Sequence, residues 1–253
     1  MKKLPALAIA FVVSVIPITA AVADTIKVAV ASNFIQPAKQ LKTLFEQQSE
    51  HRLQLSFAST GKLYAQILHG APYDVFLAAD QQRPKKLEQQ QKILPGSRFT
   101  YAVGRLAVCS SGSTVAGSPV EELLRADRIS LANPKTAPYG VAAVEVLKHF
   151  EVFDKIQQRL VYAENVAQSL HYVHTSTVGW GVVAEAMLTD EERHSCWLPP
   201  KNSYQPINQD VVALNNAKGS SSVAEFLRFL KSTEVQAVIS RYGYDIAKPA
   251  LKI

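Results

Sequence analysis

Hydroxyl and amide side chains stand at four places where a predicted strand is followed by a predicted helix. These turns are Ser32-Asn33, Ser59-Thr60-Gly61, Pro138-Tyr139-Gly140 and Asn165-Val166. The first N–H groups of a helix have no partner within it and lie at the positive end of the helix dipole. One such turn is an ordinary helix cap, but several that converge can bind an oxyanion.

The four turns carry almost no charge. Lys62, one residue inside the helix that we expect after Gly61, is their only nearby cation. Neutral donors can hold a dianion because aligned dipoles act more strongly in a dry cleft than in water. A ring of donors with no acceptor also leaves the proton of a protonated anion unpaired. The pattern therefore favours a fully ionised tetrahedral anion over hydrogen phosphate.

Other chemistries lack their motifs. A phosphate-binding P-loop that included Ser59–Lys62 would need glycine in place of Ser56 and a hydroxyl residue in place of Leu63. No G-x-S-x-G motif occurs, and His171 and His174 have no acidic or cysteine partner at a zinc-type spacing. The basic residues are scattered rather than clustered, which argues against nucleic acid as a partner. We expect a chain that is not an enzyme and that has no cofactor.

The N-terminus has the three parts of a secretory signal peptide. Lys2 and Lys3 precede an apolar run, Ala6–Ala21, and the A-x-A site Ala21-Val22-Ala23 follows it. We predict cleavage after Ala23 and export to a bacterial periplasm. Without Lys2 and Lys3, the formal charge falls from +6 to +4, with 25 basic and 21 acidic residues.

The chain has two cysteines, Cys109 and Cys196. An oxidising compartment and an even count without metal-type spacing favour a disulfide between them. Two buried thiols that lie far apart are the alternative.

Short β-rich runs alternate with helical segments, which predicts an α/β fold with mainly parallel sheets. Strands are expected at 25–31, 53–57, 74–77, 129–132, 160–163 and 178–184, and helices at 35–48, 63–69, 83–91, 141–150, 167–174, 223–230 and 235–242. The long run 99–109 and a strand at 211–214 would cross between two lobes. We predict lobe 1 at 24–104 and 208–253, and lobe 2 at 105–207.

The carboxyl ends of parallel strands share one sheet edge, where α/β proteins bind ligands. The first two turns would therefore belong to one lobe and the last two to the other. Two lobes that close on these helix starts would enclose an anion.

Several motifs occur in an order that resembles the periplasmic molybdate-binding proteins of ABC importers, over essentially all of 24–253. They are Ala31–Phe34 (ASNF), Gly61–Ile67 (GKLYAQI), Gly70–Phe76 (GAPYDVF) with Ala79-Asp80, Pro95–Ala102 (PGSRFTYA), Asn133-Pro134 with Ala137–Gly140 (APYG), and Arg241–Tyr244 (RYGY). The resemblance implies a two-lobed clamshell with two hinge crossings.

The resemblance also assigns the ligand residues. Ser32 matches a hydroxyl donor, Asn33 matches a donor found in the most similar branch, and Thr60 stands where serine is usual. Tyr139 and Val166 match backbone N–H donors. Molybdenum would be held only as molybdate, through these same residues.

One departure from the family pattern concerns Ala184. Some relatives supply a tyrosine hydroxyl from this strand, and alanine has no side-chain donor. The arrangement at Asn33 must replace that hydroxyl if the ligand is the same.

The resemblance implies a monomer that captures molybdate, and tungstate with it, for a permease at the inner membrane. One alternative is a receptor for sulfate or another tetrahedral oxyanion. Another is an exported enzyme for an anionic substrate, which would need a general base near Thr60 or Tyr139. A sensor domain would need a further signalling segment.

Overall fold

The computed structural model describes residues 23–112 and 118–246. The predicted signal peptide therefore lies outside the described residues except for Ala23. Over these two ranges, no helix combines the length and the apolar character that a membrane crossing needs.

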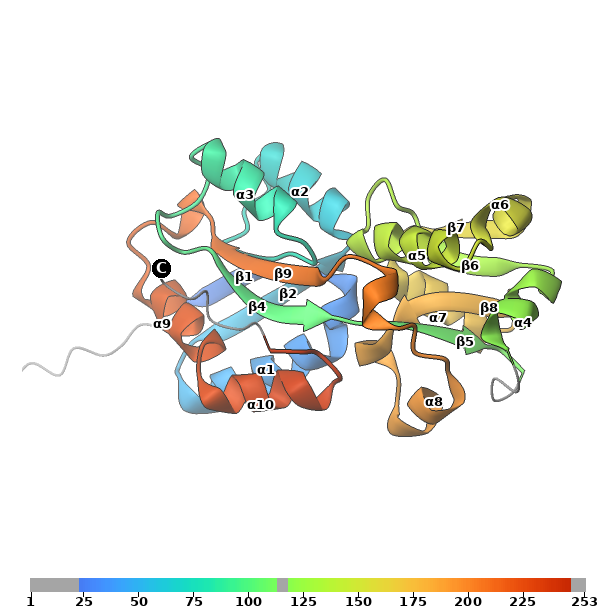
Figure 1. Cartoon of the computed structure of the whole chain (residues 1–253). Helices are drawn as coiled ribbons and strands as arrows, with labels where there is room; N and C mark the ends of the chain where they lie inside the picture. Colours follow the sequence, from blue (N-terminus) through green and yellow to red (C-terminus); the bar gives the residue numbers. More distant parts are fainter. Residues whose placement is uncertain (1–22, 113–117, 247–253) are drawn as a thin grey trace, which may run out of the picture.

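Two sheets form the centres of two lobes that lie side by side (Figure 1). Across the first sheet the strands are β2 (Arg52–Ala58), β1 (Thr25–Ala31), β3 (Val75–Leu77), β9 (Ile207–Ala213) and β4 (Phe99–Gly104). Across the second they are β5 (Leu106–Ser110), β8 (Trp180–Ala184), β6 (Ile129–Ala132) and β7 (Leu160–Ala163). We call the first sheet with its helices lobe 1, and the second lobe 2.

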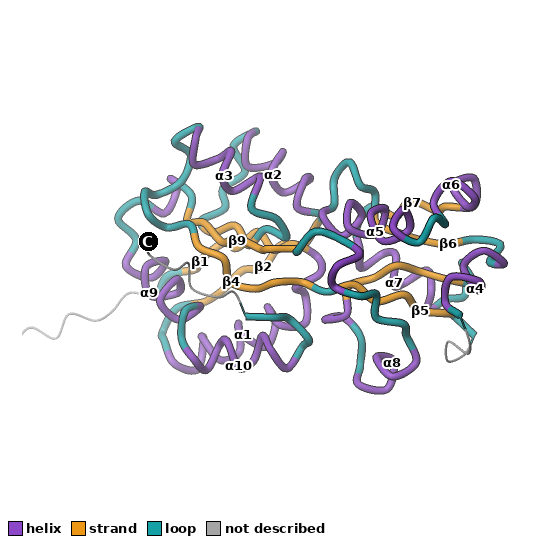
Figure 2. Tube along the Cα trace, viewed as in Figure 1, coloured by secondary structure: helices purple, strands orange, loops and turns teal. Residues whose placement is uncertain are grey.

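Helices cover both faces of the first sheet (Figures 1 and 2). Lobe 1 contains α1 (Ile35–Gln48), α2 (Thr60–Leu68), α3 (Gln82–Gln89), α9 (Ser221–Leu230) and α10 (Thr233–Arg241). Lobe 2 contains α4 (Pro119–Arg125), α5 (Pro138–His149), α6 (Phe153–Ile156), α7 (Val166–His174) and α8 (Asp190–Ser195). Single 3-10 turns lie at Ser32–Phe34 (η1), Gln157–Arg159 (η2), Glu185–Met187 (η3), Lys201–Ser203 (η4) and Asn215–Ala217 (η5).

The chain passes between the lobes twice. The run predicted as one strand, 99–109, is two strands separated by Arg105, because β4 pairs with β9 and β5 pairs with β8. The return strand β9 begins at Ile207, four residues before the predicted Val211. Both pairings of β9 and the pairing of β5 are antiparallel, whereas the other four pairings are parallel. Both sheets are therefore mixed. The strands next to a crossing between the lobes, β9 and β5, run antiparallel to the strands with which they pair.

Two helices begin three residues earlier than their apolar periodicity predicts. Helix α2 begins at Thr60 rather than Leu63, and α5 begins at Pro138 rather than Val141. Proline suits a first helical position because its φ is already helical and its missing N–H would be unpaired there. The first turn of α2 therefore contains Thr60 and Gly61, and that of α5 contains Pro138, Tyr139 and Gly140. The sequence predicts a short helix after the strand 178–184, where η3 and α8 lie, but it does not predict the short helices α4 and α6.

Apolar side chains from the two lobes meet at their interface. One cluster of buried side chains joins the first sheet to α1, α9 and α10, and another joins it to α2 and α3. A third cluster fills lobe 2, and Ala31 and Ala79 of lobe 1 belong to it. Both alanines are at most 2% exposed, so the lobes are in direct contact.

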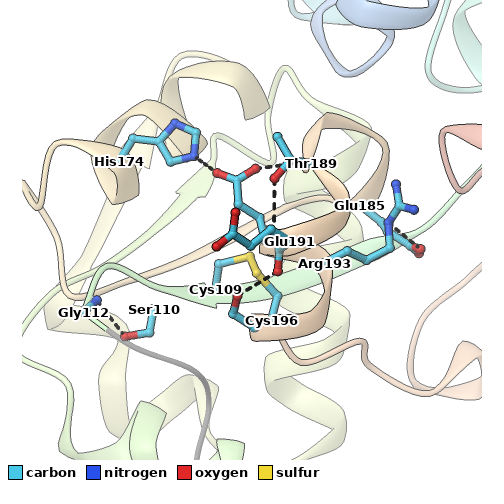
Figure 3. Close-up of a disulfide and its surroundings, with 11 residues drawn as sticks. Cys109, Ser110, Gly112, His174, Glu185, Thr189, Glu191, Arg193 and Cys196 are labelled. Atoms are coloured by element: carbon cyan, nitrogen blue, oxygen red, sulfur yellow. Dashed lines mark hydrogen bonds and ion pairs between the residues drawn. A yellow bond between two sulfur atoms is a disulfide. The ribbon is translucent and has the colours of Figure 1, made fainter.

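A disulfide joins Cys109 in β5 to Cys196, the residue after α8 (Figure 3). The neighbouring backbone strengthens this connection, because Val108 and Trp197 exchange two N–H···O bonds of 2.8 and 2.9 Å. The bond is the pairing that the sequence favoured, and it ties the α8 segment to the edge strand of the second sheet.

We predict that loss of this bond destabilises the protein by about 2–4 kcal/mol, because it closes a loop of 87 residues in the unfolded chain. Urea unfolding should be compared for the oxidised protein, the reduced protein and the double variant Cys109→Ser/Cys196→Ser. Equal unfolding midpoints for all three would contradict a stabilising role.

Candidate ligand-binding site

A small cavity of about 10 Å³ lies where the two lobes meet. All five residues assigned from the sequence line it: Ser32, Asn33, Thr60, Tyr139 and Val166. The other lining residues are Ala31, Ser59, Ala79, Ala137 and Pro138. Sites for drug-sized organic ligands usually measure about 300–1,000 Å³, so this cavity suits a much smaller ligand.

The start of α2 presents a hydroxyl with a defined direction. Thr60 Oγ1 accepts a hydrogen bond of 3.1 Å from the Ala79 N–H. One of its lone pairs is thereby used, and its own O–H proton remains available to a ligand. Thr60 is 1% exposed, so few water molecules compete for that donor.

Helix α5 offers one N–H group at its start. Pro138 has none, and the N–H groups of Gly140 and Val141 both donate to the Ala137 carbonyl, at 2.9 and 3.2 Å. Among the described residues, Tyr139 therefore supplies the first donor of this helix that its own turn does not use. That donor is the backbone N–H that the sequence assigned to the ligand.

Helix α7 presents its first N–H group in a different way. Asn165 is the N-cap, and its Oδ1 accepts from the Ala167 and Gln168 N–H groups at 3.0 and 3.1 Å. The cap thus uses the second and third donors of the helix. It leaves the Val166 N–H at the cavity wall.

The side chain of Asn33 is already occupied within the protein. Its Nδ2 donates to Gln209 Oε1 at 2.8 Å and to Tyr244 Oη at 2.9 Å. An amide nitrogen has two protons, so both are used. Asn33 can therefore serve a ligand only through its backbone N–H, and its side chain holds the first turn in place.

Around Asn33 lies a buried polar network that sequence reasoning missed. Tyr244 Oη donates to the Asn33 carbonyl at 2.9 Å, and Tyr101 Oη lies 3.1 Å from Gln209 Oε1. Gln209 Nε2 donates to Tyr139 Oη at 3.2 Å, which joins lobe 1 to lobe 2. Burial raises the pKa of Tyr101, Tyr139 and Tyr244 well above the usual phenol value. All three are therefore neutral hydroxyls near pH 7.

The backbones of the two lobes come very close at Gly61. Its N–H donates to the Thr136 carbonyl of lobe 2 at 2.8 Å. A Cβ at position 61 would lie 2.7 Å from that oxygen and 2.9 Å from Thr136 Cα. Glycine is thus required for this contact. Lys62 Nζ and Glu164 Oε1 form an ion pair of 2.6 Å beside it, again between the lobes.

The cavity wall has polar donors but no formal charge. None of the described residues that line it is acidic, basic or histidine, and Lys62 is paired with Glu164. Across the described residues, no group of three or more His, Cys, Asp or Glu side chains is placed to hold a metal ion. An anion here would be held by backbone and hydroxyl dipoles.

Two further residues, Ser59 and Ala184, bear on the composition of the cavity wall. Ser59 lines the cavity together with Thr60; the paired hydroxyls of Ser59-Thr60 were its only signal in the sequence. Ala184 is fully buried in β8 and is not part of the cavity wall.

Comparison with known proteins gives consistent matches over the described fold. The family model for bacterial extracellular solute-binding proteins matches residues 26–245. The molybdate-binding protein ModA of Rhodobacter capsulatus is 36% identical over 226 residues, which cover 88% of this chain and 89% of the relative. ModA of Azotobacter vinelandii is 38% identical over 232 residues, with coverages of 90% and 92%.

A solved structure gives the same result. The periplasmic molybdate-binding protein of Azotobacter vinelandii superposes with a TM-score of 0.83 at 35% sequence identity, over 88% of this chain and all of that one. The chain therefore belongs to the bacterial extracellular solute-binding proteins and, within that family, to the molybdate-binding proteins.

Proposed function

We propose that this protein binds molybdate, and tungstate with it, and delivers the anion to the permease of an ABC transporter. One observation carries the proposal: four helix-start turns from two lobes meet at a single small cavity with an uncharged wall. The relatives with 36% and 38% identity are molybdate-binding proteins.

The proposed ligand residues are Ser32, Asn33, Thr60, Tyr139 and Val166. Ser32 and Thr60 would donate from their hydroxyls, and Asn33, Tyr139 and Val166 from their backbone N–H groups. A dehydrated dianion needs several donors at once, because each bond that it loses to water must be replaced. Donors from both lobes would therefore favour the closed arrangement when the anion is bound.

Delivery to a permease implies a location and a partner. We propose that the protein acts in the periplasm as a monomer, after cleavage behind Ala23. Support comes from the N-terminal motif and from the periplasmic relative of known structure. A receptor for sulfate or another tetrahedral oxyanion is the second candidate, and an exported enzyme would need a general base that the described cavity wall lacks.

We expect molybdate and tungstate to raise the melting temperature of the purified protein, and sulfate, phosphate and chromate to leave it nearly unchanged. Ligand at a hundred times its dissociation constant adds about 2.7 kcal/mol of stability, or roughly 5–10 °C for a chain of this size. A shift with sulfate alone would support the second candidate. No shift with any of the five anions would refute oxyanion binding.

Replacing Thr60 by alanine should weaken molybdate binding by about 1.5–3 kcal/mol, because a hydrogen bond to a charged group is lost. Thr60→Ser keeps both the donor and the acceptor for the Ala79 N–H, so it should bind nearly as tightly as the wild type. Titration calorimetry on the three proteins measures the difference. If Thr60→Ala binds as tightly as Thr60→Ser, the hydroxyl is not a ligand donor.

Replacing Gly61 by alanine should hinder lobe closure, because the new Cβ would overlap the Thr136 carbonyl. Overpacking of this kind costs about 1–3 kcal/mol, which should appear as weaker molybdate binding. Small-angle X-ray scattering should show less ligand-induced contraction than in the wild type. Alanine also favours a helix over glycine, so the ligand-free stability should not fall.

Gly179→Ala is the matched control for this experiment, since the nearest atom to its added Cβ is 4.0 Å away. It should bind and contract like the wild type. Wild-type affinity and contraction in Gly61→Ala would show that the backbone contact with Thr136 does not accompany ligand binding.

A further inference from the structure

The hydroxyl of Ser59 has no hydrogen-bond partner within the described residues. Ser59 is 2% exposed, and its Oγ is one of three buried side-chain atoms there that lack a partner. A buried hydroxyl without a partner costs about 1–3 kcal/mol. Such groups in native structures call for a physical explanation.

Its position makes the unpaired hydroxyl more unusual. Ser59 is the N-cap residue of α2 and has the extended backbone of an N-cap, with φ −65° and ψ 148°. A serine here normally accepts from the second or third N–H of its helix, but Ser59 makes no such bond. The second N–H, that of Gly61, donates instead to the Thr136 carbonyl of lobe 2.

Other N-cap serines of the chain do form the usual bond. Ser220 accepts from Val223 N–H at 3.2 Å, and Ser232 accepts from Val235 N–H at 3.3 Å. Both of these serines accept from the third N–H of their helix, which in α2 is that of Lys62, so Ser59 differs from them in leaving this donor unused.

Ser59 also lines the cavity at which the four turns meet. Its immediate neighbour in the chain, Thr60, has its acceptor side engaged by Ala79 N–H. Because Ser59 is 2% exposed, few water molecules can reach its hydroxyl, and a ligand in the cavity that Ser59 lines would supply the missing partner.

We propose that Ser59 is a further ligand-binding residue whose hydroxyl donates to the bound oxyanion. This inference rests on the proposed function and adds a second hydroxyl donor from the α2 turn beside Thr60. The Gly61 N–H of the same turn binds Thr136 of lobe 2, so this turn would contact both the other lobe and the anion.

Two variants remove the hydroxyl with different effects on the helix. Ser59→Ala removes the donor and places a poor N-cap residue at the helix start, whereas glycine at an N-cap costs the helix only a few tenths of a kcal/mol. Both should bind molybdate about 10- to 100-fold more weakly than the wild type in titration calorimetry. The melting temperature of ligand-free Ser59→Gly should stay close to that of the wild type.

Ser232→Ala is the matched control, because it removes a serine that does cap its helix and is not part of the cavity wall. It should lower the melting temperature and leave the affinity for molybdate unchanged. Wild-type affinity in both Ser59 variants would overturn the assignment of Ser59 while leaving the proposed function intact. Failure of the wild type itself to bind any tetrahedral oxyanion would overturn the proposed function, and this inference with it.

Discussion

An anion that leaves water must receive from the protein every hydrogen bond that it gives up, because an unpaired buried charge costs far more than folding or binding can supply. The cavity wall has no cation with which to meet that requirement. It depends instead on N–H and O–H groups at helix starts, where four donors per helix lack a partner within the helix. The remaining features of the site follow from this dependence.

Each helix start keeps selected donors free and uses the others elsewhere. Proline removes one donor from α5 and the Asn165 side chain uses two from α7, so these turns do not use the N–H groups of Tyr139 and Val166. In α2, Ala79 N–H fixes the orientation of the Thr60 hydroxyl. Fixed donors lose little freedom when they bind, and this preorganisation favours affinity.

The buried polar network around Asn33 is a second set of neutral groups, and it connects the lobes. Asn33 and Gln209 of lobe 1 are linked to Tyr139 of lobe 2 by hydrogen bonds that are entirely buried. The same residue, Tyr139, thus faces the cavity with its backbone N–H and the network with its hydroxyl. Movement of lobe 2 must change both contacts together, which provides a physical route from ligand binding to lobe position.

The sequence by itself determined the α/β alternation, the two-lobed class and the four strand-to-helix turns, because strand and helix periodicities and helix-start signals are local. The choice of five ligand residues within these turns came from the resemblance to a family. Local signals could not place the break at Arg105, the antiparallel return of β9 or the contact of Gly61 with Thr136, since these depend on segments far apart in the chain. They also could not show that the Asn33 amide is already used or that Ser59 is unpaired. Whether a polar group is free for a ligand depends on every neighbour that folding brings to it, and only the tertiary structure decides that.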